Sequence, residues 1–435
     1  MSHGPDPTDT MSEVGRGRQD GGWPPRASSA DPSRPPRVFF IAGEHSGDLQ
    51  GSLVLSHLKR LRPDLMAEGI GGPLLKKAGL DCLHSLDELA VIGFVEVLKN
   101  LPHFLGIFDE VKQRLTTHKP DVLILIDYPG FNTRVAKVAK DLGIYVVYYI
   151  TPQVWAWNPS RVHGITRIID EAVVVFSFEE KIWRKAGARV SWFGHPLVGI
   201  TENRTPPAIF RAELGIGPGP VVSLLPGSRS QEIRYILPGL LDAAELIRRR
   251  KPDTRFLLPL AGTIQESLVL PHLKGRNLPL TLLRGQTYEA VAASDLALVA
   301  SGTATLETAI LGTPMIIVYQ TNLFTSIMSK FLIQKPHIGL PNVVAGRQIV
   351  PEFIRWRFQP HLIADEALSI LAHPRRQDTI RRQLAQVRAR LGQPGASERV
   401  ARHLLARIDR LVTGSGAGPA GVGGGVPAGA ERRPA

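Results

Sequence analysis

Short apolar runs alternate along this chain with segments of helical periodicity, and this alternation limits the possible folds more than any other feature. Val38–Ala42 is wholly apolar, and a polar turn then leads into a helical pattern from about Asp48 to Leu61. Buried strands of a parallel sheet have this appearance, because helices cover both faces of such a sheet. The sequence therefore predicts an α/β protein built from βα units.

The predicted strands fall into two groups, separated by a polar, Pro-containing segment at 201–210 that we interpret as an interdomain link. Residues from Glu352 to about Val412 have a helical, Arg-rich pattern with no predicted strand. A further helix is predicted over roughly Asn132–Leu142. The remaining strand runs are Asp121–Ile126, Tyr145–Ile150 and Glu171–Phe176 in the first group, and Val221–Leu225, Arg255–Leu260, Leu296–Ala300 and Met315–Tyr319 in the second.

A chain of 435 residues is long enough for two domains of ordinary size. We predict two Rossmann-like domains, at 37–200 and 201–355, followed by helices at 356–412 that pack back on the first domain or on a partner subunit. Residues 1–36 are rich in Pro, Gly, Ser and Asp, and residues 413–435 in Gly, Ala and Pro. This composition predicts a disordered N-terminal extension and a disordered tail.

Composition restricts the environment of the protein. Hydrophobic residues make up 43% of the chain and charged residues 21%, as in globular proteins. Cys82 is the only cysteine, which excludes an internal disulfide and fits a reducing compartment. No apolar stretch approaches the roughly 20 residues that span a bilayer, and the polar start lacks the apolar core of a secretory signal. We expect a cytoplasmic protein that is soluble or lies on a membrane surface.

The net charge of +13 narrows the class of partner without choosing one. Nucleic acid, anionic lipid and phosphorylated metabolites all attract a basic protein. A generally arginine-rich composition explains the same charge without any partner. Lys and Arg are not interleaved with aromatic residues as in single-strand binders, so nucleic-acid binding is not predicted.

Ligands of open α/β sheets bind beyond the carboxyl ends of the strands, so the residues after each strand are the candidates for a site. Within LLPGSRSQE (224–232), Gly227 permits close approach of the backbone, Ser228 can donate or cap, and Arg229 can bind a phosphate through its guanidinium. A plain turn with a solvated arginine is the alternative interpretation. No Gly-Lys-Ser/Thr follows, so the segment is not a P-loop.

The segment SGTATLE has the same layout one strand later. Its small residues allow the first amides of the following helix to face an anion. These residues are Ser301, Gly302, Thr303 and Ala304. Glu307, in the first turn, can accept ribose hydroxyls or merely complement the helix dipole. Two loops suited to phosphate on neighbouring strands of one sheet favour a nucleotide diphosphate site in the second domain.

Two carboxylates follow strands of the first domain. Glu44 lies in AGEHSGD (42–48), which lacks the three glycines of a dinucleotide fingerprint, so a nicotinamide cofactor is not expected. Asp127 can take a proton from a hydroxyl nucleophile, or it can cap the next helix. Trp155 and Trp157 follow another strand and can stack on a sugar or pack in an interface.

Metal chemistry has little support in the sequence. The chain contains no Asp-x-Asp, no His-Glu-x-x-His and no paired cysteines. His45, His195 and His337 are scattered, and each is expected to be a hydrogen-bonded structural residue. We predict that the protein needs neither a metal nor another cofactor.

Two apolar segments suggest contact with a lipid surface. Leu89–Phe108 is strongly apolar yet broken by charges, and Asn322–Lys335 forms one apolar helical stripe beside lysines. An amphipathic core helix is the alternative for each segment, and the basic composition favours the surface interpretation. The expected contacts with lipid or acyl chains are Phe94, Val95, Leu98, Phe104, Phe324, Met328 and Phe331.

Taken in order, several phrases of the sequence resemble one family, lipid-A-disaccharide synthase. They extend from about Val38 to Arg347, and the following helices are compatible to about Val412. SGTA-like loops recur across two-domain glycosyltransferases, so the specificity lies in the ordered set. His45 stands where Thr is expected, which leaves Glu44 unaffected. The phrases are AGEHSGD, GIGGP (69–73), ELAVIGFVEVL, IDYPGFN (126–132), YYITPQVWAWNPSRV (148–162), FGHPLV, LLPGSRSQE, ASGTATLE and GLPNVVAGR (339–347).

This resemblance implies an inverting glycosyltransferase of GT-B type, whose two Rossmann-like domains face each other across a cleft. The N-terminal domain would take the acceptor, and the C-terminal domain would bind the UDP-sugar. The implied reaction joins UDP-2,3-diacylglucosamine to 2,3-diacylglucosamine 1-phosphate, releases UDP and forms the β-1,6-linked disaccharide of lipid A, within lipopolysaccharide synthesis. Asp127 would deprotonate the acceptor 6-hydroxyl, with Glu44 as the second candidate.

The resemblance also implies how the donor is held. Arg229 and the amides at 302–304 would neutralise the leaving diphosphate, and Glu307 would hold the ribose. Asn342 matches a family position at the active site that serves donor positioning, and Arg347 is an expected anion contact. A peripheral location on the inner face of a Gram-negative inner membrane is implied as well, together with a homodimer that exchanges C-terminal segments.

Two other classes of protein stand as alternatives. A related UDP-sugar enzyme, such as a UDP-N-acetylglucosamine 2-epimerase or a peptidoglycan-type transferase, would turn over without acylated substrates. A non-enzymatic basic protein that binds membranes or nucleic acid would have no affinity for UDP. That second alternative leaves the paired loops at 226–230 and 301–307 unexplained.

Overall fold

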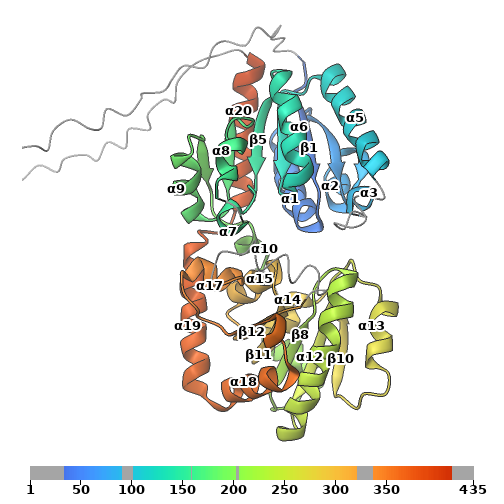
Figure 1. Ribbon diagram of the computed structural model, residues 1–435, viewed down its shortest axis with the longest axis vertical. Coiled ribbons are helices and arrows are strands. Elements are labelled where there is room, and N and C mark those ends of the chain that lie inside the picture. The colour runs from blue at the N-terminus through green and yellow to red at the C-terminus, as the bar shows by residue number, and fades with distance from the viewer. Residues whose placement is uncertain (1–33, 91–100, 158, 202–204, 321–336, 414–435) are drawn as a thin grey trace, which may run out of the picture.

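The computed structural model describes residues 34–90, 101–157, 159–201, 205–320 and 337–413. Two α/β domains lie one above the other along the longest axis, each with a parallel sheet between layers of helices (Figure 1). The prediction of an α/β protein with two Rossmann-like domains is confirmed. The predicted disordered extension and tail fall outside the described residues, apart from 34–36 and 413.

The first sheet has seven parallel strands in the order β3-β2-β1-β4-β5-β6-β7. The strand order reverses between β1 and β4, where Phe40 pairs with Ile124. Crevices at such reversals are where open sheets bind ligands. The strands are β1 (Arg37–Ala42), β2 (Met66–Gly71), β3 (Asp81–Ser85), β4 (Val122–Ile126), β5 (Tyr145–Tyr149), β6 (Glu171–Val174) and β7 (Val190–Trp192).

The second sheet has six parallel strands in the order β10-β9-β8-β11-β12-β13. Its order reverses between β8 and β11, where Leu224 pairs with Leu298. Both central strands are wholly buried, which explains their unbroken apolar sequences. The strands are β8 (Val221–Leu225), β9 (Arg255–Leu260), β10 (Leu280–Arg284), β11 (Leu296–Ala300), β12 (Met315–Tyr319) and β13 (Glu352–Ile354).

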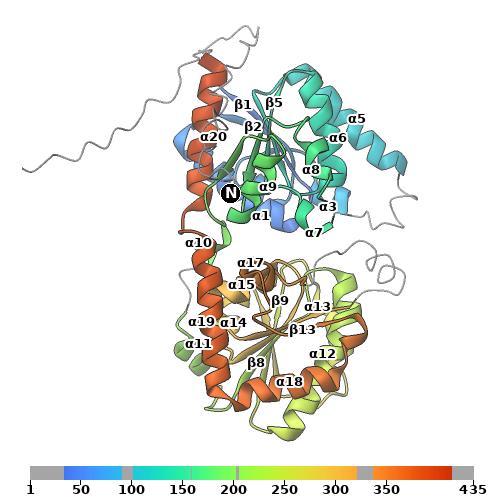
Figure 2. The ribbon, with the colours of Figure 1, turned by 60° about the vertical axis from the view of Figure 1, so that its left-hand side comes forward.

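Helices cover both faces of each sheet (Figures 1 and 2). The first domain contains α1 (His45–Leu61), α2 (Pro73–Lys77), α3 (Leu86–Ala90), α5 (Leu101–His118), α6 (Pro129–Asp141), α7 (Val154–Trp157), α8 (Arg161–Ile165), α9 (Ser177–Lys185) and α10 (Leu197–Ile200). The second domain contains α11 (Pro207–Glu213), α12 (Ser230–Arg250), α13 (Glu266–Leu273), α14 (Thr287–Ala292), α15 (Thr303–Leu311), α17 (Leu340–Ala345), the 3₁₀ turn η1 (Arg355–Arg357), α18 (Pro360–Ala372) and α19 (Pro374–Arg390).

The last helix, α20 (Ala396–Thr413), returns to the first domain and packs on α1, while α19 lies along the second (Figure 1). A buried carboxylate anchors it: Glu171 Oε1 accepts from His403 Nε2 at 2.6 Å and from Ser191 Oγ at 2.7 Å. Burial alone would raise the pKa of Glu171, but the hydrogen bonds and charges of His403 and its neighbours hold that pKa below its usual value. The two domains are thus tied together at the C-terminus as well as by the link after α10.

Several short elements differ from the sequence prediction. The region from Glu352 onward was predicted without strands, and this is wrong, because β13 pairs with β12 through Tyr319 and Ile354. A three-residue edge strand carries no periodicity of its own, so only its partner defines it. The predicted link at 201–210 partly forms α11. The sequence also did not predict strands β2, β3, β7 and β10. Of these, β3 and β7 are edge strands without a continuous apolar run, and β7 is only half-buried.

The described residues contain neither a membrane-spanning helix nor a cluster of metal-binding side chains. Within these ranges, no helix combines the length and the apolar character needed to cross a bilayer. The same residues contain no group of three or more His, Cys, Asp or Glu side chains arranged to hold a metal ion.

Candidate active site

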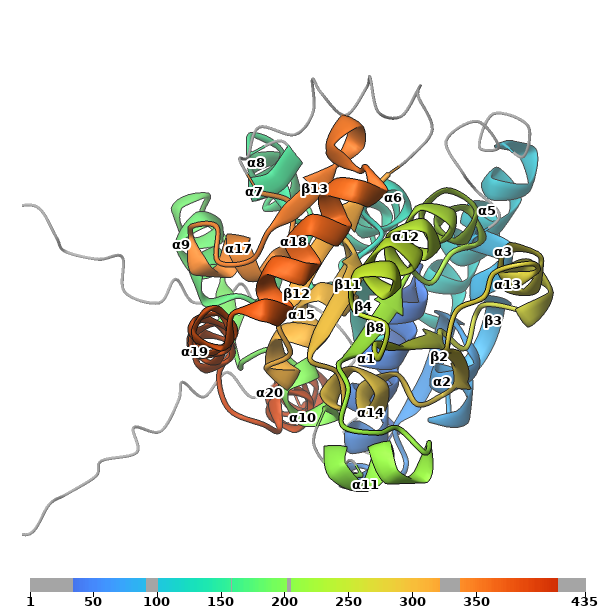
Figure 3. The same cartoon turned by 90° about the horizontal axis from the view of Figure 1, so that it is seen from below.

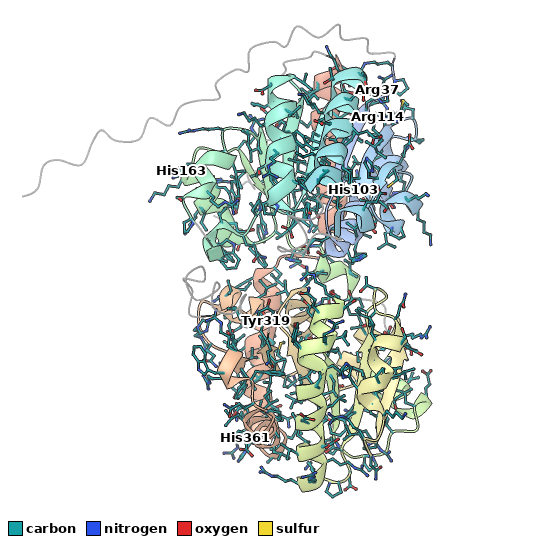
Figure 4. The ribbon with its side chains drawn as sticks, turned by 45° about the vertical axis from the view of Figure 1, so that its right-hand side comes forward. Arg37, His103, Arg114, His163, Tyr319 and His361 are labelled. Atoms are coloured by element: carbon teal, nitrogen blue, oxygen red, sulfur yellow. The ribbon has the colours of Figure 1, made fainter. Side chains whose placement is uncertain are left out.

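The reversal points of the two sheets face each other, and one ion pair joins them. Glu44 follows β1, Arg229 follows β8, and Glu44 Oε2 lies 2.8 Å from Arg229 Nη2. Figure 4 shows Tyr319, the last residue of β12, at the end of the second domain that faces the first. The candidate residues of the two domains therefore meet in one place.

Asp127 follows β4 beside this ion pair and has an unusual backbone. Asp127 and Tyr128 both adopt left-handed conformations, with φ of 47° and 48°. Such conformations cost about 1–3 kcal/mol each in residues other than glycine and persist where the surroundings enforce them. Asn132 Nδ2 and the Tyr148 hydroxyl enforce this one by donating to the Asp127 carbonyl at 2.6 and 2.7 Å.

The same surroundings change the acidity of Asp127. Burial, followed by the negative charge of Glu44, raises the pKa of its carboxyl to about 6. A general base works best when its pKa is near the operating pH, because it is then both deprotonated and basic. Asp127 therefore has the acidity of a base that can accept a proton from a hydroxyl.

Gly43 explains why this loop can lie against Glu44. A Cβ at Gly43 would be 2.1 Å from Cγ of Tyr128, so only glycine lets the tyrosine ring pack on the loop after β1. The two loops of the first domain are thereby held against each other. Gly43 of AGEHSGD thus allows the loop after β1 to pack against the loop after β4.

Asp48 of the same phrase holds the neighbouring loop. It is 2% exposed, and its carboxylate accepts three backbone hydrogen bonds, from Gly72 at 2.8 Å and from Leu74 and Leu75 at 3.0 Å. A Cβ at Gly72 would be 2.4 Å from Asp48 Oδ2, which accounts for glycine at that position. The carboxylate thus completes the N-terminus of α2.

We predict that Asp48→Ala destabilises the first domain by about 3 kcal/mol, because three buried amides lose a charged acceptor. Chemical unfolding should show the loss as a lower midpoint for that domain. Asp81→Ala, which removes an exposed carboxylate on β3, is the matched control and should leave the midpoint in place. Equal midpoints for the two variants would contradict this role of Asp48.

Backbone amides of the loop after β8 donate hydrogen bonds to a side chain at the start of α12. Glu232 Oε2 accepts from the Ser228 and Arg229 amides at 2.7 and 3.1 Å. Gly227 has φ of 124°, and a Cβ there would be 2.1 Å from the Glu232 carboxylate. Gly227 and Ser228 therefore shape the loop around Glu232, while the guanidinium of Arg229 extends to Glu44 of the first domain.

The loop after β11 leads directly into α15, whose first residue is Thr303. Gly302 and Thr303 are exposed, and no atom lies within 4 Å of a Cβ placed at Gly302. The Ser301 amide donates to Val318 at 2.8 Å, which fixes the start of the loop. The positive end of the α15 dipole thus points toward the same end of the sheet as Arg229.

Glu307 lies one turn deeper than expected. It was predicted in the first turn of the helix, which is wrong, because α15 begins at Thr303 and has no acidic residue in its first turn. The Tyr288 hydroxyl donates to Glu307 Oε1 at 3.0 Å, and burial raises the pKa of the carboxyl. A partly buried carboxylate that Tyr288 orients suits the recognition of a diol better than it suits the helix dipole.

The family of this chain follows from its similarity to known sequences. A family model described as "Lipid-A-disaccharide synthetase" matches residues 38–406. The chain belongs to the lipid-A-disaccharide synthase family. Similar proteins with the name lipid-A-disaccharide synthase occur in Geobacter metallireducens, with 42% identity over 86% of this chain and 98% of that one, and in Syntrophus aciditrophicus, with 41% identity over 86% and 98%.

Solved structures share the fold at much lower identity. A putative UDP-N-acetylglucosamine 2-epimerase from Listeria monocytogenes is 12% identical, with a TM-score of 0.60 over 87% of this chain and 97% of that one. The calicheamicin glycosyltransferase CalG4 is 15% identical, with a TM-score of 0.56 over 87% and 99%. These similarities show that this chain shares the two-domain fold of those structures.

Asn342, which the family resemblance placed at the active site, has an internal role in this structure. Its side chain is fully buried: Oδ1 accepts from the amides of Ile349 and Val350 at 2.7 and 3.0 Å, and Nδ2 donates to Glu352 Oε1 at 2.7 Å. These hydrogen bonds use both the oxygen and the nitrogen of the Asn342 side chain. We therefore expect Asn342 to hold the start of β13, and not to contact the donor directly. Arg347 is exposed, and the Gln383 amide oxygen can accept from it at 3.2 Å.

Of the expected lipid contacts, only Phe104 lies within the described residues. Phe104 is 8% exposed and packs edge-on against Phe131 at 5.2 Å between ring centroids, so its expected surface role is wrong and it is a core residue. The other expected contacts lie outside the described residues. They are Phe94, Val95, Leu98, Phe324, Met328 and Phe331.

Aromatic and histidine side chains near the domain junction are structural. Trp155 is 7% exposed and its Nε1 donates to Glu179 at 3.0 Å, which favours packing over sugar stacking. Burial lowers the pKa of His195 to about 3, and its Nδ1 accepts from the Leu197 amide. The side chain of Trp157 lies outside the described residues.

Four side chains of the candidate site were not predicted from the sequence. Tyr128 and Tyr319 line the region around Glu44 and Arg229, and Tyr288 orients Glu307. The negative charge of Glu232 contributes, after burial, to a raised pKa of Tyr319. A signal existed for Glu232 alone, because a Glu three residues into a helix is typical of a capping box.

Proposed function

We propose that this protein condenses UDP-2,3-diacylglucosamine with 2,3-diacylglucosamine 1-phosphate to give lipid A disaccharide 1-phosphate and UDP. The contact between Glu44 and Arg229 is the observation that carries the proposal. It brings a phosphate-binding cation of one domain to the crevice of the other, where Asp127 has a pKa of about 6. A transferase needs this arrangement, because donor and acceptor must meet between the domains.

The proposed reaction is a single displacement with inversion. Asp127 accepts the proton of the acceptor 6-hydroxyl while that oxygen attacks the anomeric carbon of the donor. The bond from that carbon to the diphosphate oxygen breaks, and UDP leaves with the electron pair. Arg229 and the N-terminus of α15 stabilise the negative charge that develops on UDP, so no metal is required for that purpose.

Asp127 is a better candidate for the base than Glu44. The Glu44 carboxylate is engaged in the ion pair with Arg229. The Asp127 carboxyl, by contrast, has a pKa that burial and the charge of Glu44 raise to about 6. We assign Glu44 to electrostatic tuning of Asp127 and Arg229.

The proposal places the protein peripherally on the inner face of the inner membrane, because both substrates carry acyl chains. A homodimer that exchanges C-terminal segments is also proposed. In this structure α20 packs on α1 of its own chain, and the same contact could be made by a partner subunit. Chain exchange is a common route to dimers when a terminal element docks on a separate domain.

UDP-binding strength tests the role of Glu307. We predict that Glu307→Gln lowers the affinity for UDP about tenfold, because a charged acceptor of the ribose hydroxyls becomes a neutral one. Titration calorimetry should also show little further loss when 2′-deoxy-UDP replaces UDP in the variant. Glu213→Gln, an exposed change on α11, is the control and should bind UDP normally. Unchanged discrimination between UDP and 2′-deoxy-UDP would exclude ribose recognition by Glu307.

The reaction itself is tested by UDP release from UDP-2,3-diacylglucosamine, with and without 2,3-diacylglucosamine 1-phosphate, in detergent and EDTA. Acceptor-dependent release is the expected result and establishes independence of divalent metals in the same assay. Consumption of UDP-N-acetylglucosamine without acylated substrates would favour an epimerase. No reaction with any of these substrates would reject both enzymes.

A further inference from the structure

Glu179 is a buried carboxylate that the proposed reaction does not use. It is 1% exposed and lies in the first turn of α9. Its Oε2 accepts from the Phe176 amide at 3.1 Å, which completes a capping box at the start of that helix. Its Oε1 accepts from Trp155 Nε1 of α7 at 3.0 Å. One carboxylate thus holds two separate elements, its own helix and α7.

The two hydrogen bonds explain why an acid occupies this position. A capping box alone needs one acceptor oxygen, which glutamine supplies as well as glutamate. Both oxygens of Glu179 face N–H donors, so the NH2 group of a glutamine would face a donor at one of the two positions. Burial raises the pKa of Glu179 to about 7, and the hydrogen bonds from Trp155 and Phe176 act against that increase. The cost of burying the carboxylate is therefore partly offset by the contact with α7.

Helix α7 depends on contacts with its neighbours because it is short. It has four residues, so it can form few hydrogen bonds within itself. The Ala156 amide donates to the Gln153 carbonyl at 3.0 Å, just before the helix. The ring of Phe178 packs edge-on against Trp155, with 5.4 Å between the ring centroids. Trp155 is thus the side chain through which α9 fixes α7.

The same cluster reaches the segment that returns from the second domain to the first. The rings of Phe176 and Phe178 stack with 5.4 Å between centroids, and Phe176 packs against His195 at 5.2 Å. The His195 amide donates to the Leu391 carbonyl at 2.7 Å, between α19 and α20. Contacts therefore run without a break from α7 to the point where the chain crosses between the domains.

Helix α7 lies close to the candidate base. Strand β5 is the neighbour of β4 in the sheet, and the Asp127 amide donates to the Ile150 carbonyl at 3.2 Å. Helix α7 begins at Val154, soon after that residue. It lies at the end of the first domain that faces the second in Figure 1, and α7 and α9 are close together in Figure 3 as well. A substrate hydroxyl that reaches Asp127 approaches over the carboxyl ends of β4 and β5, so α7 borders its path.

We propose that Glu179 is a positioning residue for the acceptor, because it holds α7, through the indole N–H of Trp155, as one wall of the acceptor site beside Asp127. This inference rests on the proposed transferase reaction and adds a residue to it. Without the Glu179 contact α7 would shift, and a displacement of about 1 Å near reacting atoms is enough to slow a reaction strongly. Donor binding should be unaffected, since Arg229 and Glu307 belong to the second domain.

Steady-state kinetics of the full chain with UDP-2,3-diacylglucosamine and 2,3-diacylglucosamine 1-phosphate test the proposal. In Glu179→Gln the KM for the acceptor should rise about thirtyfold, whereas the affinity for UDP by calorimetry should equal that of the wild type. Trp155→Phe, which keeps an aromatic ring and removes the N–H, should show a similar loss. Glu180→Gln is the matched control, because it makes the same change at the next position of α9, where the carboxylate pairs with Arg184 at 3.0 Å. It should behave like the wild type.

The double variant shows whether Glu179 and Trp155 act through one contact. Glu179→Gln/Trp155→Phe should lose no more than the larger of the two single losses, because one hydrogen bond can be lost only once. Losses that multiply would show two independent effects and would overturn the proposal. A fall in UDP affinity as large as the rise in acceptor KM would overturn it as well, since the damage would then extend to both domains.

Amide hydrogen exchange of residues 151–157 follows α7 without turnover. Exchange there should be about tenfold faster in Glu179→Gln and unchanged in Glu180→Gln. Faster exchange with unchanged acceptor kinetics would leave Glu179 a purely structural role and reject the proposal. If the wild type does not turn over, the proposed reaction fails, and calorimetric binding of 2,3-diacylglucosamine 1-phosphate takes the place of KM. Equal acceptor affinities of wild type and Glu179→Gln would then reject the positioning role. Melting curves establish that each variant is folded.

Discussion

Asp127→Asn should reduce turnover by about 10²–10⁴-fold while leaving UDP affinity close to that of the wild type. The substitution keeps the size of the side chain and removes its capacity to accept a proton. The Asp127 backbone contacts, to Asn132 and Tyr148, do not involve the carboxylate, so the loop should keep its shape. Turnover by the UDP-release assay and UDP binding by calorimetry separate the two effects.

Two comparisons make this result specific. Asp141→Asn, an exposed change at the end of α6, should have normal turnover. Glu44→Gln should retain more activity than Asp127→Asn, because we assign Glu44 to tuning. Near-normal turnover of Asp127→Asn would show that the base lies elsewhere, and a greater loss in Glu44→Gln would point to Glu44.

The acidity of Asp127 gives the wild type a characteristic pH dependence. A base acts in its deprotonated form, so turnover should fall as the pH drops through about 6, where Asp127 becomes protonated. An unperturbed aspartate would place this fall near pH 4. Initial rates between pH 4.5 and 8 distinguish the two cases, provided that unfolding is monitored in parallel.

The framework of this protein could be predicted from its sequence because long apolar runs mark buried parallel strands. Strands β1, β4, β8 and β11 are all wholly or almost wholly buried, and helices follow each of them. The position of the site at their carboxyl ends then follows from the architecture. Strand β13 could not be predicted, because its three residues are defined only by pairing with β12.

Candidate site residues could be chosen from the sequence, but their contacts could not. Glu44 and Arg229 are 185 positions apart in the chain, and no local pattern shows that they form an ion pair. The role of Asn342 shows the converse limit. Its presence in a family phrase suggested contact with the donor, whereas its full burial and four hydrogen bonds assign it to the scaffold. A family phrase in the sequence shows that a residue is needed, but it does not show whether that residue contacts the substrate or stabilises the fold.

The pairing of Glu44 with Arg229 also connects donor binding to the base. Arg229 is shared between Glu44 and Glu232, at 2.8 and 3.4 Å. A diphosphate that takes over the guanidinium would leave Glu44 as an unpaired negative charge near Asp127. Like charge raises the pKa of a carboxyl, so donor binding should make Asp127 a stronger base.

Arg229→Ala should lower the affinity for UDP and reduce kcat/KM by about 10²–10³-fold, because the leaving diphosphate loses its cationic partner. Arg229→Lys should recover only part of the loss, since an ammonium cannot form the paired hydrogen bonds of a guanidinium. Arg234→Ala, which removes an exposed arginine one turn further along α12, is the control and should behave like the wild type.

The pH profile of Arg229→Ala separates catalytic coupling from simple loss of binding. The positive charge of Arg229 lowers the pKa of Asp127, against the larger effects of burial and Glu44. Its removal should therefore raise that pKa and move the acidic limb of the rate profile to higher pH, whereas Arg229→Lys should leave the limb near its original position. If the limb stays in place in Arg229→Ala while UDP affinity falls, Arg229 binds the donor without influencing the base. If the limb shifts, one arginine links the nucleotide site of the second domain to the proton acceptor of the first.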